Sequence, residues 1–171
     1  MAKINVVLFA PEIPQNTGNI MRTCVGTNVL LHLIKPLGFD IDEKSLRRAG
    51  LDYLDDLKFY VYENLEEFFM KRKGKFFYLT RYGQKPLSGF DFKEVKDDIY
   101  LVFGNESKGL PNLLLRSHLE YCFRIPMSEK IRTLNLSNCV AIAVYEVLRQ
   151  LDYPDLLFSD LEAYKGENIL K

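Results

Sequence analysis

The chain has 171 residues, of which 47% are hydrophobic and 27% are charged, a composition typical of one ordinary globular domain. Its 23 basic and 23 acidic residues balance, so any binding of nucleic acid must come from a local basic patch. The three cysteines are far apart, which argues against a disulfide framework or structural zinc and favours buried, reduced thiols in a cytosolic protein. No apolar run approaches the roughly 20 residues of a membrane helix, and the N-terminus resembles a first strand rather than a signal peptide.

Short apolar runs alternate with helical segments along the chain. The strands are predicted at residues 4–9, 30–35, 58–62, 76–80, 99–103 and 121–125. Helices are predicted from Asn16 to about Gly26, over Glu43–Ala49 after Asp42, over Leu65–Lys71 with Asn64 as cap, and from about Pro111. Since the strands are continuous apolar runs, the sequence predicts an α/β fold, a mostly parallel sheet with helices on both faces.

The stretch Arg124–Leu151 contains the longest apolar helix candidate. Asn135 and Ser137 stand at its start, where their side chains can cap free backbone N–H groups. From Cys139 to Val144 the helix has no polar face, so we expect it to pack on the sheet with one side and on another subunit with the other. Residues 1–158 are predicted to form a single domain, with residues 159–171 as a C-terminal tail.

Three loops follow predicted strands at the edge where parallel α/β folds bind ligands: residues 81–88, 104–109 and 127–134. The GxGxxG fingerprint of dinucleotide-binding folds is absent from the sequence. The Gly104–Gly109 loop has P-loop spacing, but Leu110 and Pro111 replace the lysine and hydroxyl residue that grip phosphate and Mg²⁺. A nicotinamide or flavin enzyme of that type and a P-loop NTPase are therefore disfavoured.

Several motifs occur together and in order. They are NTGNIMR (16–22), FGNESKGL (103–110) and IPM (125–127) with LNLS (134–137), supported by PEIPQN (11–16) and LRRAGLDY (46–53). Together they resemble the signature motifs of the SPOUT superfamily of RNA methyltransferases. Within it, the chain resembles the TrmL (YibK) group, which 2′-O-methylates the wobble nucleotide of tRNA. The resemblance covers about residues 3–155.

The resemblance implies a SPOUT-type α/β knot, with the C-terminal part threaded into a trefoil. It also implies a homodimer that binds S-adenosylmethionine. Methyl transfer from a sulfonium requires no metal, and the sequence itself leads us to expect no membrane partner. The positions that match cofactor contacts are Leu79, Gly104, Ile125 and Thr133, with Met127 and Leu134 close by. Apolar side chains there could form a slot for adenine, and Gly104 would let the chain approach closely because it has no Cβ.

Arg22 is the candidate for the chemistry, since the family places its arginine beside the ribose 2′-hydroxyl. A guanidinium is effectively always protonated, so Arg22 could instead clamp a phosphate or orient the hydroxyl. Glu106 and Tyr145 are secondary catalytic candidates, and Asn16, Lys44, Arg47 and Arg48 are candidate RNA contacts.

Each of these residues has a simpler interpretation. Arg22 could be a surface arginine, Glu106 a solvated loop carboxylate and Tyr145 a core or interface aromatic. The basic residues at 44, 47 and 48 could form one solvated helix face, and Asn135 and Ser137 could be simple caps. Two positions depart from the group's pattern: Asn105 stands where proline is usual, and Thr133 replaces a serine.

The predicted function is S-adenosylmethionine-dependent 2′-O-methylation of the wobble cytidine or uridine in the tRNA anticodon stem-loop, by a cytoplasmic homodimer. One alternative is a SPOUT enzyme that acts on another RNA, such as ribosomal RNA. The other is a knotted RNA-binding protein without catalytic activity.

Overall fold

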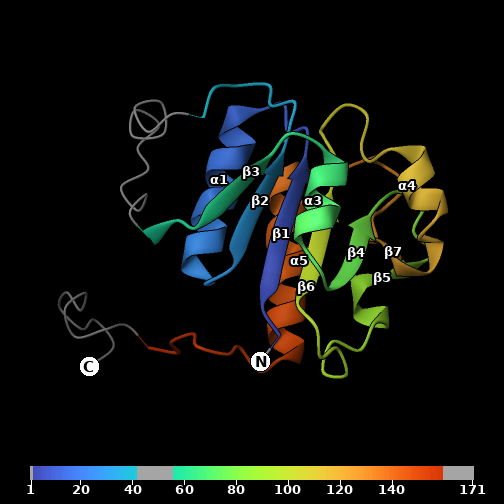
Figure 1. The fold of residues 1–171 in the computed structure, drawn as a ribbon. Coiled ribbons are helices and arrows are strands. Elements are labelled where there is room, and N and C mark those ends of the chain that lie inside the picture. The colour runs from blue at the N-terminus through green and yellow to red at the C-terminus, as the bar shows by residue number, and fades with distance from the viewer. Residues whose placement is uncertain (1, 42–55, 160–171) are drawn as a thin grey trace.

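The computed structural model describes residues 2–41 and 56–159, and its centre is one seven-stranded sheet (Figure 1). The strand order is β3-β2-β1-β6-β4-β7-β5, and every pairing between these strands is parallel. The strands are β1 (Ile4–Phe9), β2 (Leu30–Ile34), β3 (Phe59–Tyr62), β4 (Lys75–Leu79), β5 (Lys85–Pro86), β6 (Ile99–Phe103) and β7 (Cys122–Arg124). The parallel α/β prediction is confirmed.

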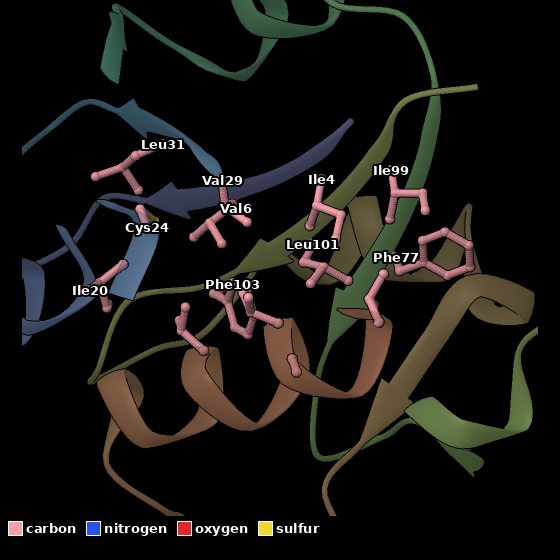
Figure 2. Close-up of a cluster of buried hydrophobic side chains, with 14 of the residues drawn as sticks. Ile4, Val6, Ile20, Cys24, Val29, Leu31, Phe77, Ile99, Leu101 and Phe103 are labelled. Atoms are coloured by element: carbon pink, nitrogen blue, oxygen red, sulfur yellow. The ribbon is translucent and has the colours of Figure 1, made fainter. Parts of the chain in front are cut away.

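Helices cover both faces of this sheet. They are α1 (Pro14–Gly26), α3 (Leu65–Lys71), α4 (Asn112–Arg116) and α5 (Leu136–Gln150), with 3-10 turns at Leu87–Gly89 and Leu119–Tyr121. Successive strand residues alternate between the faces: Val6 and Leu8 pack toward α1 and α5, whereas Val7 packs toward α3 and α4. Figure 2 shows part of the α1/α5 side of the core, where α5 lies beneath Phe103 and Leu101.

The predicted boundaries hold to within one or two residues for most elements. Helix α1 begins at Pro14 rather than Asn16, because proline at the first helical position has no N–H to leave unsatisfied. The loop predicted over Arg81–Ser88 instead contains β5 and a 3-10 turn. The predicted helix Glu43–Ala49 and the tail from residue 160 lie outside the described residues.

The predicted cap at Asn64 is confirmed. Asn64 caps α3, since its side chain accepts a hydrogen bond from the backbone N–H of Glu67. Asn28 adopts the left-handed backbone conformation, with φ of 55°, just after α1. The thiols of Cys24, Cys122 and Cys139 are free and buried, as expected.

Helix α5 is less uniformly buried than its sequence indicates. Cys139, Val140, Ala143 and Val144 are buried against the sheet, but Ile142 is 47% exposed in the single chain. The expected packing on the sheet is confirmed, and an apolar strip of the helix remains on the surface.

Strand β7 lies between β4 and β5, although β4 and β5 are joined by only a few residues. The β4–β5 connection must therefore cross the end of β7 at which the chain leaves that strand. The crossing is close, because a Cβ added to Gly83 would lie 2.3 Å from the Phe123 carbonyl carbon. Such a crossing is the arrangement that a threaded C-terminal segment requires; the trefoil knot itself stays a prediction.

Within residues 2–41 and 56–159, no helix is both long and apolar enough to cross a membrane.

Candidate functional site

The carboxyl ends of β6, β4 and β7 lie next to one another, because these strands are neighbours and parallel. Leu79 is the last residue of β4, Gly104 follows β6 directly, and Ile125 follows β7 directly. The fold therefore brings together, at one edge of the sheet, positions that are up to 46 residues apart in the sequence. This edge is where parallel α/β folds bind their ligands.

Apolar side chains line this edge. Leu79, Ile125 and Leu134 are each half-buried and pack against the same hydrophobic core. The backbone N–H of Thr80 donates to the Phe123 carbonyl at 2.9 Å, which fixes the end of β4 against β7. Met127 is half-buried and Thr133 is exposed, both on the loop that leads from β7 into α5.

Gly104 is required by the chain's own packing. A Cβ at this position would lie 2.1 Å from the Gly109 carbonyl carbon and 2.3 Å from the Leu110 nitrogen. The segment that comes close to Gly104 is therefore the far end of its own loop, at Gly109 and Leu110. Asn105 holds that loop closed, since its side-chain oxygen accepts from the backbone N–H groups of Lys108 at 2.7 Å and Gly109 at 3.0 Å.

The Glu106 carboxylate reaches back to the start of α1. It accepts hydrogen bonds from the backbone N–H of Glu12 at 2.9 Å and of Ile13 at 3.3 Å, and from the Asn16 side-chain amide at 2.8 Å. Negative charge is favourable at a helix N-terminus, where backbone N–H groups are otherwise unpaired. Glu106 therefore anchors the loop after β6 to the start of α1.

Asn16 passes the connection on to α5. Its side-chain oxygen accepts from the Asn135 side-chain amide at 2.9 Å, and the Asn135 oxygen accepts from the Ser137 backbone N–H at 2.9 Å. The predicted cap at Asn135 is confirmed. We call the hydrogen-bonded side chains of Glu106, Asn16 and Asn135 the amide relay. These side chains join the three motif segments to one another.

The electrostatics of Glu106 follow from this placement. Partial burial acts to raise the pKa of its carboxyl group, but the hydrogen bonds from Asn16 and from backbone N–H groups outweigh that effect. The pKa of Glu106 is therefore held below the ordinary value for glutamate. Glu106 is ionised and fully engaged in holding the site together, which favours a positioning role over proton transfer.

A groove between α1 and α5 contains the other two predicted catalytic residues. Its volume is about 380 Å³, and Arg22, Tyr145 and Ser137 are among the residues that line it. Arg22 is exposed on α1, and the Tyr145 side chain is 50% exposed on α5. The groove thus combines a guanidinium, a phenol and hydroxyl groups on two helices that the amide relay ties together.

The predicted RNA contacts have different placements. Asn16 is buried, with 5% of its surface exposed, and both ends of its carboxamide are occupied within the relay. Direct contact between Asn16 and RNA stays a prediction. Lys44, Arg47 and Arg48 lie outside the described residues.

Sequence reasoning missed the contribution of Glu12. The Ser107 hydroxyl and backbone N–H donate to the Glu12 carboxylate at 2.7 and 3.2 Å, a second link between the loop after β6 and the start of α1. A signal was present, since Glu12 follows a strand that pairs with β6 and must lie near the loop leaving that strand.

The chain is similar to known proteins in both sequence and fold. Residues 3–145 match the sequence profile of the SpoU rRNA Methylase family. A Bacillus subtilis (strain 168) protein assigned provisionally as a tRNA (cytidine(34)-2′-O)-methyltransferase is 52% identical over 90% of this chain and 96% of its own length. The tRNA (cytidine(34)-2′-O)-methyltransferase of Escherichia coli (strain K12) is 42% identical over 92% of this chain and 99% of its own. A solved structure that describes the 2-OH methylation of C/U34 on tRNA superposes with a TM-score of 0.79 at 37% identity, covering 88% of this chain and 97% of its own.

Proposed function

The chain belongs to the SpoU rRNA methylase family, and from that membership we propose that it methylates the ribose 2′-oxygen of nucleotide 34 in tRNA. The methyl donor is S-adenosylmethionine, and the target is cytidine or uridine. The observation that carries the proposal is the similarity to tRNA (cytidine(34)-2′-O)-methyltransferases over nearly the full length of both chains.

The edge formed by β6, β4 and β7 suits the cofactor. Leu79, Ile125 and Leu134 offer half-buried apolar surface for a flat adenine, and backbone N–H and C=O groups of the surrounding loops are the kind of group that binds its polar edge. Gly104 keeps its loop closed beside this surface. When bound here, S-adenosylmethionine supplies a methyl group activated by its sulfonium charge. Thr133 and Met127 belong to the loop that covers the same edge.

Arg22 acts on the RNA in this proposal. Arginine stays protonated in proteins, so its guanidinium is suited to clamping a phosphate and orienting the 2′-hydroxyl. With S-adenosylmethionine bound, the methyl group would pass from its sulfur to the 2′-oxygen and the hydroxyl proton would pass to water, while Arg22 would hold the ribose in place. Alignment of the reacting atoms is the main requirement for such a displacement. Tyr145 lines the same groove and helps to position the ribose.

The amide relay supplies that alignment. Glu106, Asn16 and Asn135 connect the loop after β6, the helix that carries Arg22 and the start of α5. Glu106 is therefore a positioning residue in this account. Lys44, Arg47 and Arg48 remain candidates for phosphate contacts.

We further propose that the protein acts as a cytoplasmic homodimer whose two subunits share one anticodon stem-loop. The exposed apolar strip of α5, with Ile142 at 47% exposed, is the surface that a second copy would cover. Ile142→Asp should convert the dimer to a monomer, which sedimentation velocity would detect as a halved mass of the sedimenting species. Leu113→Asp on α4 is the control, and it should leave the dimer intact. A wild-type monomer would refute the dimer.

The activity is tested by incubating the protein with methyl-labelled S-adenosylmethionine and either bulk tRNA or ribosomal RNA. The proposal expects label in tRNA. Label in ribosomal RNA alone would favour the other substrate class. Absence of transfer to any RNA, despite cofactor binding, would favour a knotted RNA-binding protein without catalysis.

A further inference from the structure

An arginine–tyrosine pair lies on the turn between β4 and β5. The Tyr82 side chain is 55% exposed, and the Arg81 guanidinium lies 4.7 Å from the centre of its ring. The Arg81 guanidinium also donates a hydrogen bond to the Tyr82 phenol oxygen. The pair thus presents an aromatic face and a cation together on the surface.

The turn is held in place by its backbone. The N–H of Gly83 donates to the Thr80 carbonyl at 3.1 Å, and the N–H of Tyr82 donates to the Thr80 hydroxyl at 3.3 Å. Gly83 is buried against the backbone of Phe123 and Arg124, leaving no space for a side chain. An exposed aromatic ring on an ordered turn loses little conformational entropy when it binds a partner.

The position of the turn connects it with the candidate active site. The turn follows Leu79 directly, and it packs on the residues immediately before Ile125. Tyr82 therefore lies beside the edge of the sheet assigned to the cofactor. Figure 1 shows this region, at β4, β7 and β5, toward the opposite edge of the sheet from β3.

The charge of this region favours a polyanion. Residues 79–90 contain Arg81 and Lys85 and no carboxylate. Arg124 is exposed on β7 and pairs in register with Pro86 of β5. Three cations therefore accompany one exposed tyrosine on neighbouring segments.

We propose that Tyr82 is a stacking platform for an unpaired base of the RNA substrate, with Arg81 contacting the phosphate beside it. Unpaired loop bases are read largely by stacking on aromatic side chains, and a guanidinium adds both cation–π and phosphate contacts. This inference deepens the proposed tRNA methylation and rests on it, because the substrate places an unpaired anticodon loop at this edge. Tyr82 holds the base next to the reacting ribose.

The chain contains a matched control. Tyr60 on β3 is 44% exposed and carries Arg72 at 4.3 Å from its ring centre. This second pair serves the fold, because Arg72 also donates to the Tyr62 hydroxyl at 2.7 Å and Tyr60 stacks on buried His32 at 5.4 Å. It lies at the far edge of the sheet, so removing it should not change RNA affinity.

The test measures binding of an unmodified anticodon stem-loop RNA by fluorescence anisotropy. Tyr82→Ala should weaken binding about tenfold, since stacking on one aromatic ring is worth on the order of that factor per base. Tyr82→Phe should bind within about twofold of wild type because the ring is retained. Arg81→Gln should make the slope of log affinity against log salt concentration shallower, by an amount that corresponds to the loss of about one phosphate contact. Tyr60→Ala is the control, and circular dichroism confirms that each variant is folded.

A second readout reports stacking directly. A series of stem-loops carries 2-aminopurine, each at a different loop position. Wild-type protein should quench the fluorescence of the probe at one position, and Tyr82→Ala should not quench it there. Wild-type affinity and quenching in Tyr82→Ala would overturn the inference, as would an equal loss of affinity for a loop-free RNA duplex. If wild-type protein stacks the base yet transfers no methyl group, the proposed function fails while the stacking site stands.

Discussion

The Asn135 side-chain amide donates to the Asn16 side-chain oxygen at 2.9 Å, across 119 residues of sequence. Asn16 in turn donates to Glu106 at 2.8 Å. These two contacts make one asparagine the link between the helix that carries Arg22 and the two loops at the carboxyl edge of the sheet. These contacts hold the three motif segments together at one place in the fold.

Asn16→Ala should destabilise the fold and the site together. The substitution leaves a partly buried amide and carboxylate without one partner each, a loss of about 2–3 kcal/mol in the free energy of unfolding. Urea denaturation measures it. Asn19→Ala is the control, since Asn19 is exposed on the same helix, and it should change stability by less than about 0.5 kcal/mol. Equal stability of the two variants would contradict the relay.

Gly104→Ala should be poorly tolerated. The added methyl group would meet backbone atoms of Gly109 and Leu110 at 2.1–2.5 Å, so the loop after β6 must open. Overpacking of this kind costs about 1–3 kcal/mol. Thermal unfolding should show the loss, and calorimetric titration should show weaker binding of S-adenosylmethionine.

The control for that experiment is Gly26→Ala, because a Cβ at Gly26 meets nothing within 4 Å. If Gly104→Ala were as stable as Gly26→Ala and bound cofactor equally well, the close approach would not be a constraint on the loop.

His32 predicts a pH dependence of stability. Its ring is fully buried in β2 and bonded to Tyr62 and Asn5, and burial, with a smaller effect of Arg72, lowers its pKa from 6.5 to about 3. Below pH 6.5 the unfolded chain takes up a proton that the folded chain does not. The contribution of His32 to the free energy of unfolding is therefore fully present above pH 6.5 and is lost as the pH drops toward 3.

The expected size of that effect is about 1.4 kcal/mol per pH unit at most, or about 2 kcal/mol between pH 6.5 and 5. Urea unfolding of wild type and His32→Gln at both pH values gives the comparison. The variant should be less stable at pH 6.5, but its free energy of unfolding should change less between the two pH values. The same change in both proteins would mean that His32 is not the titrating group. Glu106 does not interfere, because its own contribution is lost only below its ordinary pKa of 4.5.

The sequence predicts local structure well where the information is local. Continuous apolar runs identify the buried strands, and Asn64 and Asn135 cap the helices expected of them because a cap acts on residues two or three positions away. Strand β5 was missed because Lys85–Pro86 has neither an apolar pattern nor the length of a strand. It forms only because β7 supplies a partner from elsewhere in the sequence.

The site is only partly visible in the sequence. Leu79, Gly104 and Ile125 could be placed at one edge because each lies at or directly after the carboxyl end of a predicted strand. The relay could not, since its contacts join residues 90 and 119 positions apart and depend on the strand order. Glu106 was predicted as a catalytic candidate, and only its three hydrogen bonds indicate that it positions other groups.

Arg22→Ala should reduce methyl transfer by about 100-fold or more, because the substrate loses the group that aligns it. Affinity for S-adenosylmethionine should stay within about twofold of wild type, since the cofactor edge is formed by other residues. Single-turnover rates and calorimetric titration separate the two effects. Arg116→Ala, an exposed arginine at the end of α4, is the control. Full activity of Arg22→Ala would refute its role.

The most direct measurement is nucleotide-resolved mass spectrometry of unmodified tRNA after reaction with the purified protein and S-adenosylmethionine. The account predicts one added 2′-O-methyl group, on the ribose of cytidine or uridine 34, and a strongly reduced yield of that group with Arg22→Ala. A methyl group on a base, on another nucleotide or on no tRNA at all would contradict it.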